Sequence, residues 1–382
     1  MRRAIALGGL TGGLAALAAD PRVAATVAAG TWPPFVLVLG LVLIGEVGAA
    51  TGLFDRAAAA AGRLGRSGAS LFLALLGMVA ATSAVLNLDT AAAFLTPVLV
   101  LAARRRGLAE EPFLYGSLFM ANSASLLLPG SNLTNLLVAG TDPPGGGPGA
   151  MVGAWGAAVV VTAGILALRY RRDLADGPRP VTGSGPGGPP ATGTRSSDER
   201  RGGGIAVAAG ATAAAGALVV GWRSPALAVL GVGTLAAGVE AGRRRLEVAT
   251  TLRQLDLGVL GGLFGIAVAL ATLATRWSGL GALLATATSW ETAGTAALAA
   301  VAVNNLPAAV LLASHAPAHP RALLVGLDVG PNLAVTGSLA SLLWWKAARS
   351  VGASPSARTY SRLGLVLGPC AMAAALAALA FT

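Results

Sequence analysis

Four groups of polar residues interrupt long apolar stretches of the chain. The most pronounced lies in NSASLLLPGSNLTNLL at residues 122–137, and the others are NLDT at 87–90, NNLP at 304–307 and LDVGPNLAVTGSLAS at 327–341. An unpaired polar group is costly in hydrocarbon, so such groups face a cavity or bind a solute. The predicted substrate-binding residues are Asn87, Asn122, Ser131, Asn132, Thr134, Asn135, Asn304, Asn305, Asn332, Thr336, Gly337, Ser338 and Ser341.

Prolines within these groups indicate broken helices. Pro129 and Gly130 unwind the backbone, which then offers carbonyl groups, and the half-helix that follows offers N–H groups. Pro307 also breaks a helix, because proline removes a backbone donor and the residue before it avoids the helical conformation; it follows Asn304 and Asn305 closely. Two alternatives stay open: the 122–135 group can serve as a polar helix–helix contact, and the asparagines at 304–305 can repair a broken helix.

Three carboxylates lie in or beside apolar stretches, namely Asp89, Asp328 and Glu46. We expect them to take up a proton or to bind a coupling cation. For Asp89 the alternative is a helix cap at a loop, because Asn and Asp cap helices well. For Glu46 the alternative is a position near the cytoplasmic end of its helix.

Several classes of function are excluded by what the sequence lacks. One cysteine, Cys370, and two histidines provide no disulfide framework and no zinc cluster. The glycine-rich stretch at 145–149 has no Lys-Ser/Thr and follows no strand, so it is not a P-loop. No carboxylate pair or Ser-His arrangement has the spacing of an intramembrane enzyme. We therefore expect no catalytic residue, no metal site and no cofactor.

Composition identifies a membrane protein. The 382 residues are 55% hydrophobic and only 11% charged, whereas soluble domains carry about 25% charged residues. The fold class expected is an all-α polytopic membrane protein with about 10–13 transmembrane or re-entrant segments. The apolar runs are 4–19, 34–51, 69–86, 89–102, 113–138, 150–168, 205–221, 225–240, 257–275, 279–303, 305–316, 322–345 and 361–381.

The net charge of +11 comes from arginines in the loops between these runs. If each run crosses the membrane once, the arginine clusters fall on the side of the N-terminus. This predicts a multi-pass protein of the bacterial cytoplasmic membrane, with a cytoplasmic N-terminus and an external C-terminus. No basic stripe is interleaved with aromatic residues, so we expect no nucleic-acid binding. Residues 1–20 are similar to a secretory signal peptide, with a basic start and a short apolar core, but we expect a retained first helix.

The chain divides into two membrane halves, 1–172 and 205–382, joined by a Pro/Gly/Ser/Thr-rich segment at 173–204 that we expect to be a flexible cytoplasmic linker. Aligning PGSNLTNLL with VTGSLASLL matches Asn132 with Ser338 and Asn135 with Ser341. The first run of this repeat enters from opposite sides in the two halves. The sequence therefore predicts two inverted-topology repeats, a plan common among transporters.

Four stretches resemble the arsenite efflux permease (ArsB-type) family: LDTAAAFLTPVLVLAARRRG, SASLLLPGSNLTNLLV, NNLPAAVLLAS and LDVGPNLAVTGSLASLLWW. They are more loosely similar to the ion-transporter superfamily of dicarboxylate, citrate and sulfate permeases. The resemblance implies two helical hairpins that meet at the substrate site. It places Ser131, Asn132, Asn135, Gly337, Ser338 and Ser341 at hairpin tips, and Asn87, Asp89, Asn304, Asn305 and Pro307 in unwound regions. The second half departs from sodium-coupled relatives because it lacks their Ser-Asn-Thr.

The resemblance implies a secondary transporter, first an arsenite/antimonite efflux permease driven by a proton gradient or the membrane potential. The alternative is a sodium- or proton-coupled anion transporter for dicarboxylate, citrate or sulfate. Arsenite is an uncharged trihydroxide at neutral pH, which suits amides and hydroxyls. Apart from Arg362 at the edge of the last run, no Arg or Lys lies inside an apolar run. The expected partners are a small anion or oxyacid and the lipid bilayer. A homodimer and a separate ATPase subunit stay open.

Overall fold

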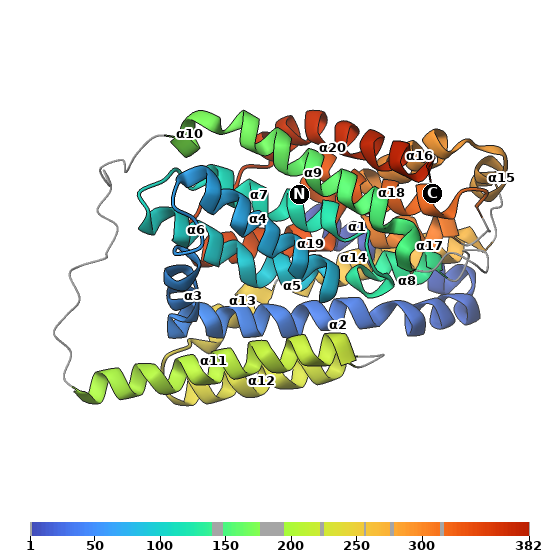
Figure 1. The fold of residues 1–382 in the computed structure, drawn as a ribbon. Coiled ribbons are helices and arrows are strands. Elements are labelled where there is room, and N and C mark those ends of the chain that lie inside the picture. Colours follow the sequence, from blue (N-terminus) through green and yellow to red (C-terminus); the bar gives the residue numbers. More distant parts are fainter. Residues whose placement is uncertain are drawn as a thin grey trace.

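The chain folds into a bundle of helices (Figure 1). The computed structural model describes residues 2–139, 148–175, 195–221, 225–255, 257–275, 279–313 and 317–381, and no strand occurs among them. The α-helices are α1 (Arg2–Ala19), α2 (Pro21–Thr51), α3 (Leu53–Ala61), α4 (Gly68–Val85), α5 (Leu88–Thr90), α6 (Thr96–Arg105), α7 (Glu111–Ala124), α8 (Leu133–Ala139), α9 (Val152–Arg169), α10 (Arg171–Ala175), α11 (Arg195–Gly221), α12 (Ala226–Gly242), α13 (Val248–Leu255), α14 (Leu257–Ala274), α15 (Gly279–Thr286), α16 (Ser289–Val303), α17 (Asn305–Ala313), α18 (Pro320–Val329), α19 (Leu339–Ser350) and α20 (Ala357–Leu379). A π-helical turn, η1 (Ala91–Leu95), joins α5 to α6, and 3-10 turns are η2 (Pro129–Ser131), η3 (Pro148–Met151), η4 (Gly330–Leu333) and η5 (Val335–Gly337).

The helices follow the apolar runs of the sequence. Five helical stretches in the described residues are long and apolar enough to cross a membrane: Pro21–Thr51, Gly68–Val85, Gly149–Arg169, Val248–Ala274 and Ala357–Leu379. Several other runs are divided by breaks at the polar groups, as the proline positions predicted. The fold class, an all-α polytopic membrane protein, is confirmed.

Reciprocal caps fix the start of two helices. At α4, the Ser67 hydroxyl accepts from the Ser70 N–H at 3.1 Å, and the Ser70 hydroxyl accepts from the Ser67 N–H at 2.9 Å. Thr288 and Glu291 form the same arrangement at α16. Each cap satisfies N–H groups that a helix start leaves without partners. Both helices open a hairpin, so the caps determine where the hairpins begin.

Small residues allow α1 and α14 to pack closely. A Cβ added to Gly9 would lie 1.8 Å from the Gly262 carbonyl oxygen, and one added to Gly13 would lie 3.3 Å from the Gly265 Cα. Without a hydrophobic driving force between helices in lipid, such close backbone contact is a main source of attraction. The glycines in this pair are therefore needed for close contact between α1 and α14.

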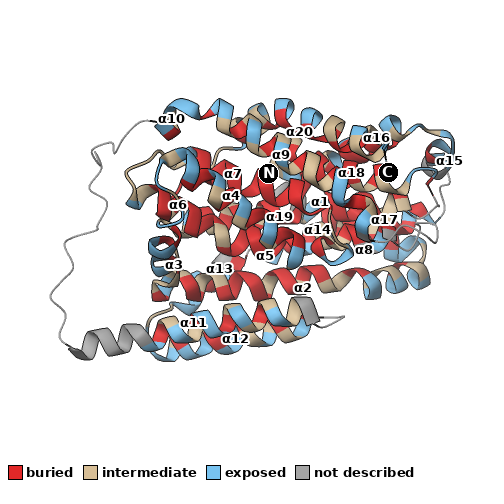
Figure 2. Cartoon of the chain, viewed as in Figure 1, coloured by how far each residue is buried: buried red, intermediate tan, exposed pale blue. Residues whose placement is uncertain are grey.

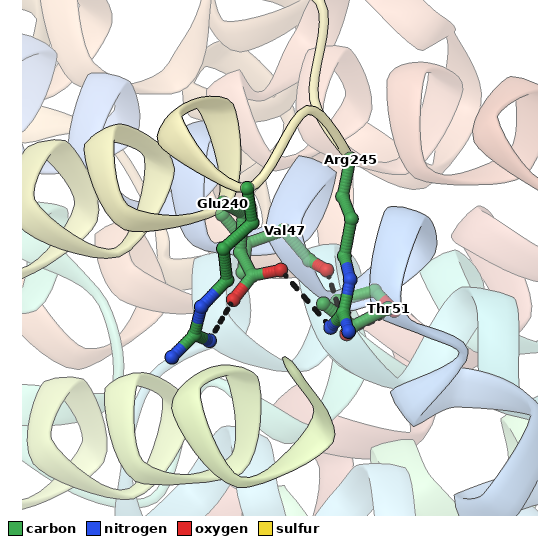
Figure 3. A network of polar contacts seen from close by, with 6 residues as sticks. Val47, Thr51, Glu240 and Arg245 are labelled. Carbon is green, nitrogen blue, oxygen red and sulfur yellow. Dashed lines mark hydrogen bonds and ion pairs between the residues drawn. The ribbon is translucent and has the colours of Figure 1, made fainter. Parts of the chain in front are cut away.

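The arginine-rich loops gather at one end of the bundle, called here the basic end. Arg105 pairs with Asp55 at 3.1 Å, and Arg104 donates to the Val351 carbonyl. Figure 3 shows a third meeting point, where Arg245 lies beside both Glu240 and the last turn of α2. Its fully buried carboxylate pairs with Arg243 at 2.7 Å and Arg245 at 3.3 Å. Contacts between distant loops thus bring the basic clusters together.

The first hairpin consists of α4, α5, η1 and α6. It leaves the basic end at α4 and returns to it at α6, because Arg106 donates to the Gly65 carbonyl. Its tip, residues 86–90, holds the NLDT group. The second hairpin, α16 and α17, enters from the opposite end, where the Ala318 N–H donates to the Leu284 carbonyl at 3.2 Å. Its tip, residues 304–307, holds the NNLP group.

Two broken helices cross the bundle from end to end. The first, α7 and α8, begins at the basic end, where Tyr170 at the end of α9 donates to Glu111 at 3.0 Å. The second, α18 and α19, begins near Ala318 and ends at the basic end, where Val351 accepts from Arg104. These helices therefore run in opposite directions. We call their breaks crossing 1 (residues 125–135) and crossing 2 (residues 330–341).

This arrangement corrects one expectation from the family resemblance. The motifs at Ser131–Asn135 and Gly337–Ser341 lie at the breaks of crossing helices, whereas the residues expected in unwound regions, Asn87–Asp89 and Asn304–Pro307, lie at hairpin tips. Both kinds of motif are polar helix interruptions with proline or glycine nearby. Only the tertiary contacts at the segment ends distinguish a hairpin from a crossing.

The segment between the halves is described only at its two ends. Residues 173–175 belong to α10, and α11 begins at Arg195, inside the range for which the sequence predicts a linker. The remaining residues of that prediction, 176–194, lie outside the described residues. The division into an N-terminal half, linker and C-terminal half stays a prediction.

Burial is concentrated in the broken helices. Figure 2 shows buried residues filling α7, α18 and α19, whereas α11 and α12 lie along one side with exposed residues on their outer faces. All the polar side chains predicted to bind substrate are buried, except that of Thr336. The polar groups thus lie inside the bundle, as the cost of exposing them to lipid requires.

Candidate functional site

A small central cavity lies where the hairpin tips and the crossings converge. Its volume is about 10 Å³, close to the minimum for one water molecule. The two tips and the two crossings each contribute residues, and α2 contributes Pro34; the lining is Pro34, Leu88, Asp89, Asn132, Leu133, Asn305, Leu306, Leu339 and Ala340. Four interrupted elements therefore end at one point inside the bundle.

The two crossings share one backbone conformation. Asn132 has φ −147° and ψ 144°, and Ser338 has φ −140° and ψ 154°. Each follows a three-residue 3-10 turn, and each caps the next helix: the Asn132 side-chain oxygen accepts from the Thr134 N–H at 3.3 Å, and the Ser338 hydroxyl accepts from the Ser341 N–H at 3.3 Å. The sequence alignment of these two positions is confirmed.

At crossing 1, a carboxylate from the other half binds the polar side chains. Asp328 Oδ1 accepts from the Asn132 amide at 2.7 Å and from the Thr134 hydroxyl at 2.9 Å. Asp328 Oδ2 is buried and has no hydrogen-bond partner among the described residues. Since Asn132 also lines the central cavity, the carboxylate is one hydrogen bond away from the cavity wall.

At crossing 2, the equivalent contact comes from an amide. The Ser338 hydroxyl donates to Asn122 Oδ1 at 3.3 Å, and Asn122 in turn donates to Asn332 at 3.0 Å and to the Tyr360 hydroxyl at 3.3 Å. Asn332 also donates to the Ser123 hydroxyl at 2.9 Å. This group is a closed network without a residual unpaired side-chain atom among those described.

The remaining polar residues of the crossings stabilise the breaks themselves. The Ser131 hydroxyl donates to the Ser125 carbonyl at 2.5 Å, and the Asn135 amide donates to the same carbonyl at 2.7 Å and to the Leu128 carbonyl at 3.1 Å. These carbonyls have lost their helical partners, so the side chains replace the missing hydrogen bonds. Gly337 is required by space, because an added Cβ would lie 2.5 Å from the Pro331 Cα.

The hairpin tips contribute one group each to the cavity. Asp89 and Asn305 line it, whereas Asn87 caps α5 by accepting from the Thr90 N–H at 2.7 Å. Asn304 has a positive φ of 81°, which asparagine tolerates better than most residues, and donates to the Thr336 carbonyl at 3.2 Å. The Thr336 hydroxyl donates to the Val301 carbonyl at 2.9 Å. The second hairpin is therefore bonded to crossing 2 at both Val301 and Asn304.

Glu46 lies apart from this centre. It lines a separate cavity of about 20 Å³ with Lys346 and Ser350, between α2 and α19. Lys346 is buried within α19, although the sequence placed it in a loop and indicated no basic residue inside an apolar run. Two oppositely charged groups on facing helices reduce the cost of burying either one.

Several residues of the site escaped the sequence analysis. Tyr360 joins the Asn122 network, Ser123 bonds to Thr162 at 2.8 Å, and Pro34 closes the central cavity. Pro34 and Tyr360 stand outside the four polar groups of the sequence, and Ser123 lies inside the first group but was not among the predicted residues. One pattern could have indicated the cross-contacts: Asn122 and Asp328 each stand ten residues before the aligned pair Asn132 and Ser338.

Comparison with known proteins places the chain in a transporter family. The family model for the citrate transporter family (CitMHS) matches residues 1–339. The chain belongs to this family. No curated protein sequence matches it. The crystal structure of the Alcanivorax borkumensis YdaH transporter, described as having an unusual topology, is similar with a TM-score of 0.47 and 14% identity, over 94% of this chain and 87% of that chain.

Membership of the CitMHS family establishes the general activity. The chain is an integral membrane transport protein of the secondary-transporter type, and the family points to a small anion as substrate. It also supports the broader resemblance to ion-transporter permeases. The match does not support the resemblance to arsenite permeases in particular. The choice of substrate has to be argued from the residues of the site.

Proposed function

We propose that the chain exports a small, weakly charged oxyacid of the arsenite type in exchange for protons. The observation that carries this proposal is the lining of the central cavity. Asp89, Asn132 and Asn305 supply its polar groups, and no Arg or Lys is among the lining residues that the structure describes. An uncharged trihydroxide can both donate and accept hydrogen bonds, so it matches amides and a carboxylate without needing a cation.

Electrostatics disfavours a bare polycarboxylate at the same place. A citrate trianion would face Asp89 directly and Asp328 through Asn132. Like charges a few ångströms apart in a poorly screened interior repel by several kcal/mol. The only buried lysine among the described residues, Lys346, lines the other cavity with Glu46. We propose that Glu46 balances this lysine and does not couple transport.

Asp328 is the proposed coupling group. One of its oxygens accepts two hydrogen bonds from crossing 1, and the other has no partner among the described residues and can accept a proton. Protonation would weaken Oδ1 as an acceptor and so release Asn132, which lines the cavity. Proton binding would thereby change the substrate site through a single hydrogen bond. Asp89, which is in the cavity wall, is proposed to contact the substrate.

We further infer that the basic end faces the cytoplasm. The loops that meet there hold Arg63, Arg66, Arg104–Arg106, Arg169, Arg171, Arg172 and Arg243–Arg245. Cytoplasmic loops of membrane proteins carry an excess of Lys and Arg. With this orientation the first hairpin enters from the cytoplasm and the second enters from outside.

A carboxylate transporter is the second candidate, because the matching family is described by citrate. Leu339 and Ala340 are the first residues of α19, directly after its N-cap Ser338, and both line the cavity. The N-terminal end of α19 is therefore at the cavity wall. The N-terminus of a helix attracts an anion. This could replace a basic side chain for a mono- or dicarboxylate carried with protons or sodium.

A flux assay in proteoliposomes separates the two candidates. Purified protein would be tested for counterflow of arsenite, citrate, succinate and sulfate, with and without a pH gradient and a sodium gradient. We expect arsenite flux that a pH gradient stimulates, and its loss in Asn132→Leu protein that still inserts. Sodium- or proton-driven citrate or succinate flux without arsenite flux would reject the first proposal in favour of the second.

A further inference from the structure

A second, larger cavity lies at the basic end, away from the transport site. Its volume is about 630 Å³, and it is bounded by the mouth of the first hairpin and by the end of α9 with α10. Arg66 comes from the start of the hairpin, Arg106 from its end and Arg171 from α10. The volume lies within the range of about 300–1,000 Å³ that is usual for ligand sites.

The three arginines of this cavity have positive charge that the described residues do not neutralise. None of them forms an ion pair with a described carboxylate, and no acidic residue is among the described residues that line the cavity. The neighbouring arginines differ, since Arg104 pairs with Glu110 and Arg105 pairs with Asp55. Three arginines without an ion-pair partner among the described residues therefore line one cavity.

The rest of the lining is apolar or small. Leu108, Leu174, Ser67, Gly68 and three alanines complete it. Leu174 is buried, whereas Arg66 and Arg171 are exposed. Arg106 is fixed by its hydrogen bond to the Gly65 carbonyl. An anionic head with an attached hydrocarbon chain fits this combination, whereas a fully hydrated ion would leave the apolar part unused.

We propose that this cavity binds the phosphate headgroup of an anionic phospholipid of the cytoplasmic leaflet, with an acyl chain along Leu108 and Leu174. Guanidinium groups bind phosphate oxygens in pairs, and basic pockets between transmembrane helices on the cytoplasmic side are suited to anionic headgroups. Because both ends of the first hairpin and α10 line the cavity, the bound lipid links the base of the hairpin to the end of α9. The site is independent of which solute is carried.

The test measures lipid binding to the full-length protein by native mass spectrometry, with phosphatidylglycerol and phosphatidylcholine as probes. The test variant is Arg66→Gln with Arg171→Gln. The matched control is Arg63→Gln with Arg172→Gln, which removes two exposed arginines from the same two segments but outside the cavity. We expect the test variant to bind phosphatidylglycerol about 30-fold more weakly. The control should bind it like the original protein.

Three outcomes would overturn the proposal. Equal loss in the two double variants would indicate attraction by overall charge alone. Full displacement of phosphatidylglycerol by millimolar inorganic phosphate, with equal protection of the protein against heat by phosphate, would indicate a free-phosphate site. Comparison of the two lipids on the unaltered protein needs no variant, so equal binding of both would also reject the proposal. None of these results depends on the flux assays.

Discussion

Crossing 1 and crossing 2 have the same backbone but different chemistry at their reciprocal contact. Asp328 reaches crossing 1 and accepts from Asn132, while Asn122 reaches crossing 2 and accepts from Ser338. Asn122 and Asp328 occupy equivalent places in the two halves, ten residues before the aligned pair. The amide is held in a network with its hydrogen bonds satisfied, whereas the carboxylate keeps one oxygen without a partner among the described residues.

The difference indicates that the two halves have different roles in transport. A closed network of amides and hydroxyls holds one arrangement, because breaking any of its bonds exposes a buried polar group. A carboxylate with an open oxygen has two protonation states, and each favours a different set of donors. We infer that crossing 2 is the fixed support and crossing 1 is the part that responds to protons.

Asp328→Asn would make the two reciprocal contacts alike, and we expect it to have the largest effect. The amide cannot exchange a proton, so flux driven by a pH gradient should fall by about 100-fold or more. Exchange of substrate across vesicles without a gradient should persist, because the substrate-binding side chains are unchanged. Both fluxes are measured in the same proteoliposomes.

The control for this experiment is Asn122→Asp, which adds a carboxylate to the other half. It should disturb the closed network and lower the melting temperature without creating a second coupling site. Stimulation by a pH gradient that survives in Asp328→Asn would show that the proposed asymmetry has no role in coupling.

The next largest effect is expected from giving crossing 2 the residue that ends the 3-10 turn of crossing 1, which is the substitution Gly337→Ser. Ser131 has room for its hydroxyl, which repairs crossing 1, whereas Gly337 has Pro331 against it. We expect Gly337→Ser to cost about 2 to 3 kcal/mol through overpacking. Thermal unfolding in detergent, followed by tryptophan fluorescence, would measure this. A melting temperature unchanged from the original protein would contradict the tight fit of crossing 2.

Removing the amide of Asn122 tests the fixed support. Asn122→Leu loses hydrogen bonds to Asn332, Tyr360 and Ser338. At about 0.6 kcal/mol for each bond inside a membrane protein, the loss is about 2 kcal/mol. We expect a lower melting temperature with gradient stimulation retained in the folded fraction. Loss of stimulation at unchanged stability would move the coupling role to crossing 2.

The sequence predicted most of the fold because lipid imposes strong rules. Apolar runs matched helices, and the aligned residues Asn132 and Ser338 share a conformation. The sequence could not show which polar interruptions are hairpin tips and which are breaks in crossing helices. This depends on contacts such as that of Arg106 with Gly65. These contacts join residues that are far apart in the chain and that have no pattern in common.

The site was predicted in its residue types but not in its partners. All the predicted polar residues of the crossings lie at the breaks, yet only Asn132 among them lines the central cavity. The others satisfy backbone groups or one another, because burial demands a partner for each. Lys346 was missed since a single lysine at the end of an apolar run looks the same whether it ends a helix at the interface or lies inside it.

The smallest expected effect separates two residues that the alignment treats as equivalent. Asn135 donates to the Ser125 and Leu128 carbonyls. Among the described residues, the Ser341 side chain bonds only to Ser338, at 3.0 Å. Asn135→Ala should therefore cost about 1.2 kcal/mol and Ser341→Ala about 0.6 kcal/mol. Hydrogen exchange at the amides following each break would show the same order, with faster exchange in crossing 1 after the first substitution. Equal effects would mean that Asn135 does not repair the broken helix, and that the two crossings are supported in the same way.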